Sequence, residues 1–139
     1  MTSAKPFDPA SATIAIVTYN RSHLLRGLLE SIITMEPKPG HVVVIDNASS
    51  DDTTEVVDSY RERLGTELVY RRLDTNTGGS GGFSEGMRTA YDLGSEWIWL
   101  MDDDVEVLPD GLARMGDWTP RFKSIQGRRY DYDGSEFYW

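Results

Sequence analysis

The most informative stretch of this chain reads Trp97-Ile98-Trp99-Leu100-Met101-Asp102-Asp103-Asp104. Its apolar residues are continuous and do not alternate with polar ones, a pattern typical of a central strand buried on both faces of a parallel sheet. The three carboxylates follow at the carboxyl end of this predicted strand, where open α/β sheets bind their ligands. We therefore predict an α/β fold with a ligand site beside residues 102–104.

The acidic triplet also predicts what kind of ligand binds. Neighbouring ionised carboxylates repel by roughly 4 kcal/mol per pair at about 4 Å and an effective dielectric of about 20. A hard cation such as Mg²⁺ or Mn²⁺ removes this cost, and both metals prefer carboxylate oxygen. A solvated acidic turn is the alternative for an isolated triplet, but its position behind a buried strand favours a divalent metal site.

Strands and helices alternate along the rest of the chain. The predicted strands cover 13–18, 42–45, 67–73, 97–101 and 122–132. Asn20 is the expected cap of a first helix, and further helices are predicted over 51–64, 83–93 and 109–115. An apolar stripe marks the first helix: Leu24, Leu25, Leu28, Leu29, Ile32 and Ile33. This order predicts a mainly parallel sheet flanked by helices. Residues 1–12 are expected to form a loose leader, and residues 13–139 one domain.

Composition excludes several classes of function. The chain has 139 residues, a net charge of −9 and a pI near 4.6, and an acidic protein lacks the basic footprint that nucleic acid requires. It has no cysteine, which excludes disulfides and thiol catalysis and fits a reducing compartment such as the cytoplasm. No apolar run is long enough to span a bilayer.

Polar side chains follow three of the predicted strands, as Thr18-Tyr19-Asn20, Asp46-Asn47 and the acidic triplet. The carboxyl ends of parallel strands meet at one rim, so these side chains are expected to converge on one ligand. Tyr19 is a candidate to stack on a base, with rim packing as the alternative. Asp46 is placed like the carboxylate that holds a ribose or base in nucleotide-binding folds, with a helix cap or Asx turn as the alternative.

A glycine-rich segment, Asn76-Thr77-Gly78-Gly79-Ser80-Gly81-Gly82, precedes the predicted helix at 83–93. Its backbone N–H groups and the following helix N-terminus suit an anion, and its glycines allow close approach of a ligand. It lacks the Lys-Ser/Thr of a Walker A loop and follows the third strand, unlike a dinucleotide fingerprint. A flexible turn is the alternative.

Four segments of the chain have to be considered together. They are Ile16-Val17-Thr18-Tyr19-Asn20-Arg21, Val44-Ile45-Asp46-Asn47-Ala48-Ser49-Ser50-Asp51, Asn76-Thr77-Gly78-Gly79 and Met101-Asp102-Asp103-Asp104. Together these segments resemble the family 2 glycosyltransferases of the Rossmann-like GT-A fold. Order and spacing match over about residues 13–116. Within the family, the similarity is greatest to cell-wall galactofuranosyltransferases and related rhamnosyltransferases. It lies in Gly-Gly-Ser-Gly-Gly-Phe at 78–83 and Trp-Leu-Met-Asp-Asp-Asp at 99–104.

This resemblance implies roles for the rim residues. Thr18, Tyr19 and Asp46 would hold the uracil and ribose of a UDP- or dTDP-sugar, and the remaining donor contacts would come from Asn20, Asn76, Gly78 and Gly79. Asp102 would contact ribose or metal, Asp103 the donor sugar, and Asp104 the Mn²⁺ or Mg²⁺ on the diphosphate. The cation would also act as a Lewis acid for the leaving nucleotide.

The resemblance further implies an inverting transferase with a glycan or glycolipid acceptor. We expect it in the cytoplasm, either free or at the inner face of the plasma membrane. Such enzymes take their catalytic base from an acceptor-binding half, which we expect beyond Trp139, so the chain is predicted to be an N-terminal, donor-binding fragment. Without that half, the aromatic residues of 122–139 are expected to drive self-association.

Other functions remain as alternatives. A nucleotide-sugar-binding module without catalysis is the principal one. A nucleotidyltransferase or a Rossmann dehydrogenase would need a glycine-rich loop after the first strand. A phosphatase with an aspartate nucleophile would carry its Asp-x-Asp there, whereas this chain has its acidic residues after the fourth strand.

Overall fold

The computed structural model describes residues 5–135. Its sheet has four parallel strands in the order β3-β2-β1-β4. Their bounds are β1 (Ala12–Thr18), β2 (His41–Asp46), β3 (Glu67–Arg72) and β4 (Trp97–Asp102). The helices are α1 (Ser22–Ile33), α2 (Thr53–Tyr60), α3 (Gly78–Asp92) and α4 (Gly111–Gly116), after a 3₁₀ turn, η1 (Pro9–Ser11). The predicted α/β fold with a parallel sheet is confirmed.

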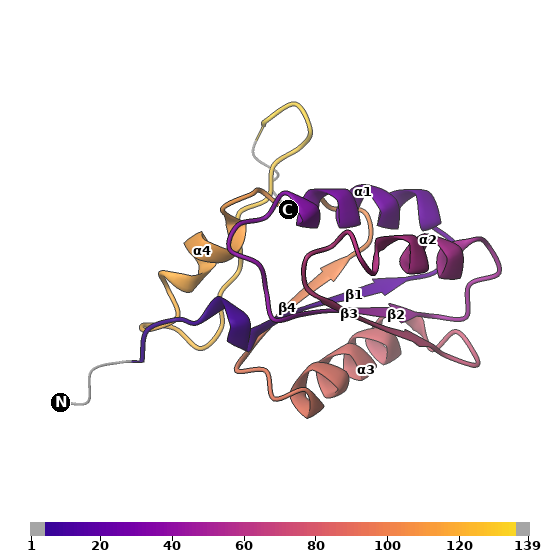
Figure 1. Cartoon of the computed structure of the whole chain (residues 1–139), viewed down its shortest axis with the longest axis horizontal. Coiled ribbons are helices and arrows are strands. Elements are labelled where there is room, and N and C mark those ends of the chain that lie inside the picture. Colours follow the sequence, from indigo (N-terminus) through magenta and orange to yellow (C-terminus); the bar gives the residue numbers. More distant parts are fainter. Residues whose placement is uncertain (1–4, 136–139) are drawn as a thin grey trace.

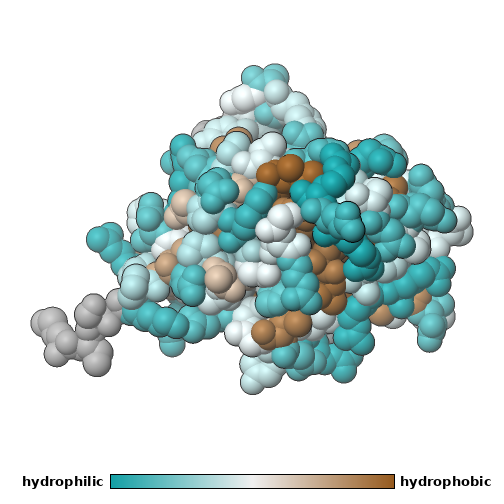
Figure 2. Space-filling model, in the orientation of Figure 1, coloured by the Kyte–Doolittle hydropathy of each residue, from teal (hydrophilic) through white to brown (hydrophobic). Residues whose placement is uncertain are grey.

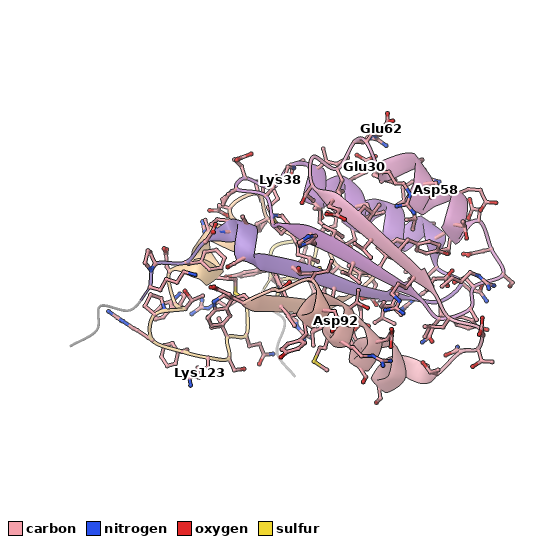
Figure 3. The ribbon with its side chains drawn as sticks, turned by 60° about the horizontal axis from the view of Figure 1, so that its bottom comes forward. Glu30, Lys38, Asp58, Glu62, Asp92 and Lys123 are labelled. Atoms are coloured by element: carbon pink, nitrogen blue, oxygen red, sulfur yellow. The ribbon has the colours of Figure 1, made fainter. Side chains whose placement is uncertain are left out.

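Helices cover both faces of the sheet (Figure 1): α1 and α2 lie on one face and α3 lies on the other. Strand residues alternate between the two layers, as the pleat requires. Ile14 and Ile16 of β1 belong to the larger core with α1 and α2, whereas Ala15 and Val17 face α3. Charged side chains such as Asp58 and Asp92 lie on the outside (Figure 3).

Strand β4 differs from its prediction as a central strand. Among residues 5–135 it pairs only with β1, so it is an outer strand of the sheet. Its apolar run is therefore only partly buried, and Leu100 is 39% exposed. A continuous apolar run predicted the strand correctly but could not distinguish a position inside the sheet from one at its edge.

The glycine-rich segment also differs from its prediction as a loop. Helix α3 begins at Gly78 and not near Phe83, so most of the glycines are helical. Glycine is a poor helix former, but a close contact explains its use here. A Cβ on Gly82 would lie 2.6 Å from Val17 Cγ1, so the glycine lets α3 approach the sheet.

The remaining differences concern the ends of the chain and of helices. Residues 122–132 form no strand; Tyr130 alone makes an isolated bridge. Part of the expected leader is structured, because η1 is capped by Asp8 and Ala12 is buried in β1. Helix α2 is shorter than predicted, and α4 starts at Gly111. Within the described residues, no helix has the length and hydropathy to cross a membrane.

Candidate functional site

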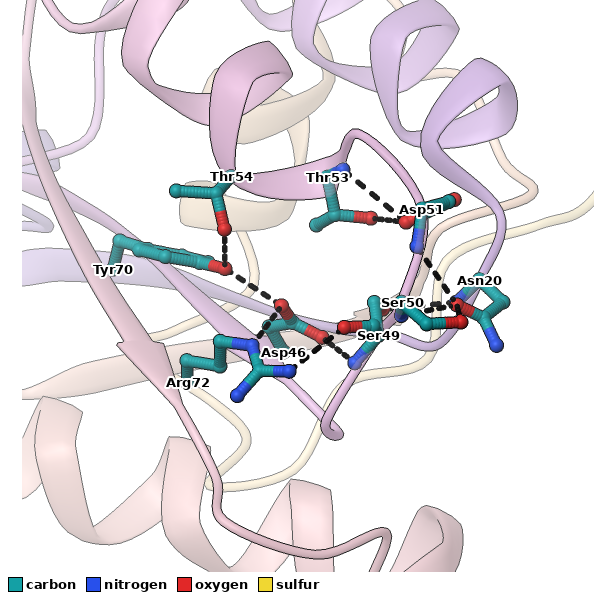
Figure 4. A network of polar contacts seen from close by, with 9 residues as sticks. All are labelled: Asn20, Asp46, Ser49, Ser50, Asp51, Thr53, Thr54, Tyr70 and Arg72. Carbon is teal, nitrogen blue, oxygen red and sulfur yellow. Dashed lines mark hydrogen bonds and ion pairs between the residues drawn. The ribbon is translucent and has the colours of Figure 1, made fainter.

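The loops after β1 and β2 are tied together at the carboxyl edge of the sheet (Figure 4). The backbone N–H of Asn20 donates to Ser49 Oγ at 2.9 Å, and Asn20 Oδ1 accepts from the Ser50 N–H at 2.7 Å. Asn20 adopts a left-handed φ of 51°. The expected capping role of Asn20 is wrong: α1 follows Arg21, and Asp51 Oδ2 accepts from the N–H of Ser22, its first residue.

Asp46 lies at the end of β2 with its carboxylate fully buried. Its Oδ1 accepts from the Ser49 N–H at 2.8 Å, and its Oδ2 accepts from the Tyr70 hydroxyl at 2.6 Å (Figure 4). Arg72 Nε lies 3.7 Å from the same Oδ2. Burial, followed by the bond to Asp46, raises the pKa of Tyr70 to about 12. Asp46 thus organises the rim, and its contact with a nucleotide stays a prediction.

Tyr19 and Thr18 have opposite exposures although they are neighbours in sequence. The Tyr19 side chain is 45% exposed beside these loops, so its ring is accessible to a flat ligand. Thr18 is 1% exposed, and its hydroxyl donates to Asp103 Oδ2 at 2.7 Å. Thr18 therefore connects β1 to the acidic triplet.

Asp103 is the buried member of the triplet, with no exposed surface. Arg21 Nη2 lies 2.7 Å from Asp103 Oδ1, and Arg21 Nε donates to Oδ2 at 3.2 Å. Burial raises the pKa of Asp103, an effect opposed by the Thr18 hydrogen bond and the charge of Arg21. Both hydrogen bonds to Asp103 go to Oδ2, and Oδ1 has only the ion-pair contact with Arg21 and no hydrogen bond among the described residues. Asp103 is thus held beneath the rim by Thr18 and Arg21, and its contact with a donor sugar stays a prediction.

Asp102 and Asp104 are the exposed members of the triplet. In the described part of the chain, no three His, Asp or Glu side chains are grouped to hold a metal by themselves. This arrangement still fits Mg²⁺ or Mn²⁺, because such ions are commonly held by one or two carboxylates together with substrate phosphates. The two exposed carboxylates are suited to that type of site.

The N-terminus of α3 is fixed to the end of β2 by Asn47, which is 3% exposed. Asn47 Oδ1 accepts from the Thr77 N–H at 3.0 Å, and Asn47 Nδ2 donates to the Gly78 carbonyl at 2.9 Å. Asn76 Oδ1 accepts from the Gly78 N–H at 2.8 Å, whereas Gly79 is exposed. The helix N-terminus predicted to receive an anion is thus held beside the Asp46 loop.

No site role was predicted for Arg21, Tyr70 or Arg72, whereas Asn47 was expected at the rim together with Asp46. Tyr70 and Arg72 are two positions apart on β3, so their side chains lie on the same face of the sheet, beside Asp46. This spacing can be read from the sequence. Asn47 directly follows Asp46, and only its contacts reveal its role. Arg21 meets Asp103 across 82 residues of sequence, a proximity that no local pattern contains.

The parallel sheet, its acidic carboxyl edge and the glycine-rich helix N-terminus beside it define an open α/β domain, a class that binds ligands at the carboxyl ends of its strands. The chain belongs to glycosyl transferase family 2, whose family model matches residues 13–139.

Specific relatives support this assignment. The galactofuranosyltransferase GlfT1 of Mycolicibacterium smegmatis is 40% identical over 89 residues, which cover 64% of this chain and 28% of that protein. The crystal structure of Staphylococcus aureus TarS with UDP superposes with a TM-score of 0.68 at 25% identity, over 77% of this chain and 31% of that one. The mannosyltransferase PcManGT of Pyrobaculum calidifontis, bound to GDP-Man and Mn²⁺, matches with a TM-score of 0.64 at 26% identity, over 78% and 32%. The chain therefore spans about a third or less of each relative.

Proposed function

We propose that this chain binds a nucleotide-diphosphate sugar at the carboxyl edge of its sheet, as the donor-binding part of a glycosyltransferase. The observation that carries the proposal is the convergence of the Asp46 loop, the α3 N-terminus and the acidic triplet at one edge. The relatives bound to UDP and to GDP-Man support a nucleotide-sugar as ligand.

The proposed donor position follows from the chemistry of these groups. Tyr19 offers an aromatic face to the base. The buried Asp46 carboxylate orders the loop beside it through its bonds with Ser49 and Tyr70. The α3 N-terminus offers the backbone N–H of the exposed Gly79 to a phosphate, whereas the Gly78 N–H already donates to Asn76 Oδ1. UDP- or dTDP-linked sugars are the proposed donors.

A divalent cation would be held by Asp104, with Asp102 beside it. When bound, such a cation neutralises the diphosphate and stabilises the leaving nucleotide. A net charge of −9 makes this neutralisation important, because two phosphates would otherwise meet the carboxylates directly. The Mn²⁺ bound to PcManGT supports the same choice of ion.

The transfer itself is also part of the proposal. We propose that the sugar passes to a glycan or glycolipid with inversion at the anomeric carbon, at the cytoplasmic face of the membrane. The names of two relatives support sugar transfer, one a galactofuranosyltransferase and the other a poly(ribitol-phosphate) β-N-acetylglucosaminyltransferase.

Calorimetry with UDP tests the binding step. We expect UDP to bind in the presence of Mn²⁺ or Mg²⁺ and to bind little in EDTA. Asp104→Asn should weaken metal-dependent binding by about 2–4 kcal/mol, because a charged ligand to the cation is lost. Asp110→Asn is the matched control, since Asp110 pairs with Arg114 on α4. Equal UDP affinity with metal and with EDTA would contradict the metal-assisted site.

A further inference from the structure

Arg21 places a guanidinium directly against the acidic triplet. It contacts Asp103 through two nitrogens, at 2.7 Å and 3.2 Å, and its Nη1 lies 3.5 Å from Asp104 Oδ2. One positive charge is therefore shared between the buried carboxylate and an exposed carboxylate that we assign to the cation.

The two contacts differ in strength. Asp103 is fully buried, so breaking its ion pair would leave an uncompensated charge away from water, which is strongly destabilising. The Asp104 side chain is 49% exposed and its contact is longer, and such ion pairs contribute little. Arg21 is thus held firmly by Asp103 and only weakly by Asp104.

Arg21 is also held in place through its backbone. Its carbonyl accepts from the Leu24 and Leu25 N–H groups at 3.0 Å and 3.1 Å, so the residue belongs to the first turn leading into α1. The side chain is 43% exposed. Because the guanidinium is rigid, its contacts with Asp103 fix the position of Nη1, and the exposed Asp104 side chain is the group that can turn away from Arg21 while those contacts persist.

We propose that Arg21 is a positioning residue of the acidic triplet, which holds Asp103 in place and yields Asp104 when a divalent cation binds. This inference rests on the proposed function for the choice of Asp104 as a cation ligand. Arg21 repels a free cation, and the negative diphosphate compensates for that repulsion. Arg21 thereby favours the metal–nucleotide complex over free metal.

The first experiment measures Mn²⁺ affinity without nucleotide, by electron paramagnetic resonance of the free ion. Arg21→Gln should bind Mn²⁺ roughly three- to tenfold tighter than the wild type, because a positive charge beside Asp104 is removed. Arg26→Gln is the matched control: Arg26 is exposed on α1, and its loss changes the net charge equally. Equal Mn²⁺ affinity of the two variants would overturn the proposal.

A second measurement separates positioning from folding. Arg21→Gln leaves Asp103 buried without its cation, so its urea midpoint should fall, and adding Asp103→Asn should restore much of the loss. Additive effects of the two substitutions would overturn the ion-pair part of the proposal. If Arg21→Gln does not fold, Mn²⁺ affinity is compared between the Asp103→Asn backgrounds of Arg21→Gln and Arg26→Gln.

UDP titrations in Mn²⁺ distinguish this inference from the proposed function. If the wild type does not bind UDP but Arg21→Gln binds Mn²⁺ more tightly than Arg26→Gln, the proposed function fails and the Arg21 inference stands. If the wild type binds UDP with Mn²⁺ and the two variants have equal Mn²⁺ affinity, the Arg21 inference alone fails.

Discussion

Tyr70 connects β3 to the candidate site through a single hydrogen bond. Its hydroxyl donates to Asp46 Oδ2 and lies 2.9 Å from Thr54 Oγ1. Replacing Tyr70 by Phe removes a donor from a fully buried carboxylate. We expect Tyr70→Phe to lower the free energy of unfolding at pH 7 by about 1–3 kcal/mol.

The same bond predicts a pH dependence. Tyrosine titrates near pH 10 in an unfolded chain, whereas the pKa of Tyr70 is raised to about 12 in the fold. Its contribution to stability is therefore complete below about pH 10 and is lost as the pH rises through about 12. Urea unfolding between pH 9 and 12 should show a steeper loss for the wild type than for Tyr70→Phe. Parallel curves would show that Tyr70 titrates normally.

At the scale of elements, α3 illustrates how packing overrides local preference. Gly82 is buried where a Cβ would overlap Val17, whereas a Cβ on Gly79 would meet nothing within 4 Å. Gly82→Ala should destabilise the protein by about 1–3 kcal/mol through overpacking. Gly79→Ala should be neutral or stabilise it by up to about 1 kcal/mol, because alanine is the better helix former. Urea unfolding of both variants is the measurement, and equal effects would contradict the close contact.

Strands β1 and β2 were predictable because runs of β-branched residues buried on both faces have few other structures available to them. The start of α3 was not, since the glycines of residues 78–82 indicate a loop by propensity and become helical only through contact with β1. The predicted strand at 122–132 is absent for a related reason. It was suggested by the alternation Tyr130-Asp131-Tyr132-Asp133, with aromatic and charged residues on opposite sides. A strand needs a partner for its backbone groups, and alternation does not supply one.

The candidate site, too, could be predicted only in part from the sequence. Topology alone brought Asp46 and the acidic triplet to one rim, because parallel strands end on one side. The different burial and contacts of the three triplet residues could not be predicted from the sequence. Only the fold shows that Asp103 is buried against Thr18 and Arg21 while Asp102 and Asp104 are exposed.

At the scale of the whole molecule, exposed aromatic side chains gather after α4. They are separate from the most hydrophobic areas in Figure 2, which lie mainly over the middle of that face between hydrophilic ones. Trp118 and Phe122 are 50% and 51% exposed, with ring centroids 6.1 Å apart, and Tyr132 is 82% exposed. The aromatic residues Phe137–Trp139, which were part of the prediction, lie outside the described residues.

We expect these exposed rings to drive self-association at high protein concentration, without the strand edge predicted for 122–132. Light scattering should give a mass that rises with concentration. A Trp118→Ser/Phe122→Ser variant should stay closer to the monomer mass. Tyr91→Ser is the control, because Tyr91 is 77% exposed on α3, away from this segment. A wild type with constant monomer mass would contradict the prediction.

A second surface feature lies away from the proposed nucleotide site and is an alternative place for a ligand to bind. A shallow hollow of about 400 Å³ lies at the amino end of β4, lined by Glu96, Trp97, Ile98 and Lys123. It is at the opposite end of β4 from the acidic triplet. A ligand that binds there would shift different backbone signals from one that binds at the carboxyl edge.

The most direct measurement is therefore an NMR titration of backbone amide signals with UDP and Mg²⁺. We expect the largest chemical-shift changes at residues 18–21, 46–50, 76–80 and 102–104, and we expect EDTA to reverse most of them. Shifts centred on Trp97 and Lys123, or no shifts at saturating UDP and Mg²⁺, would contradict a nucleotide site at the carboxyl edge of the sheet.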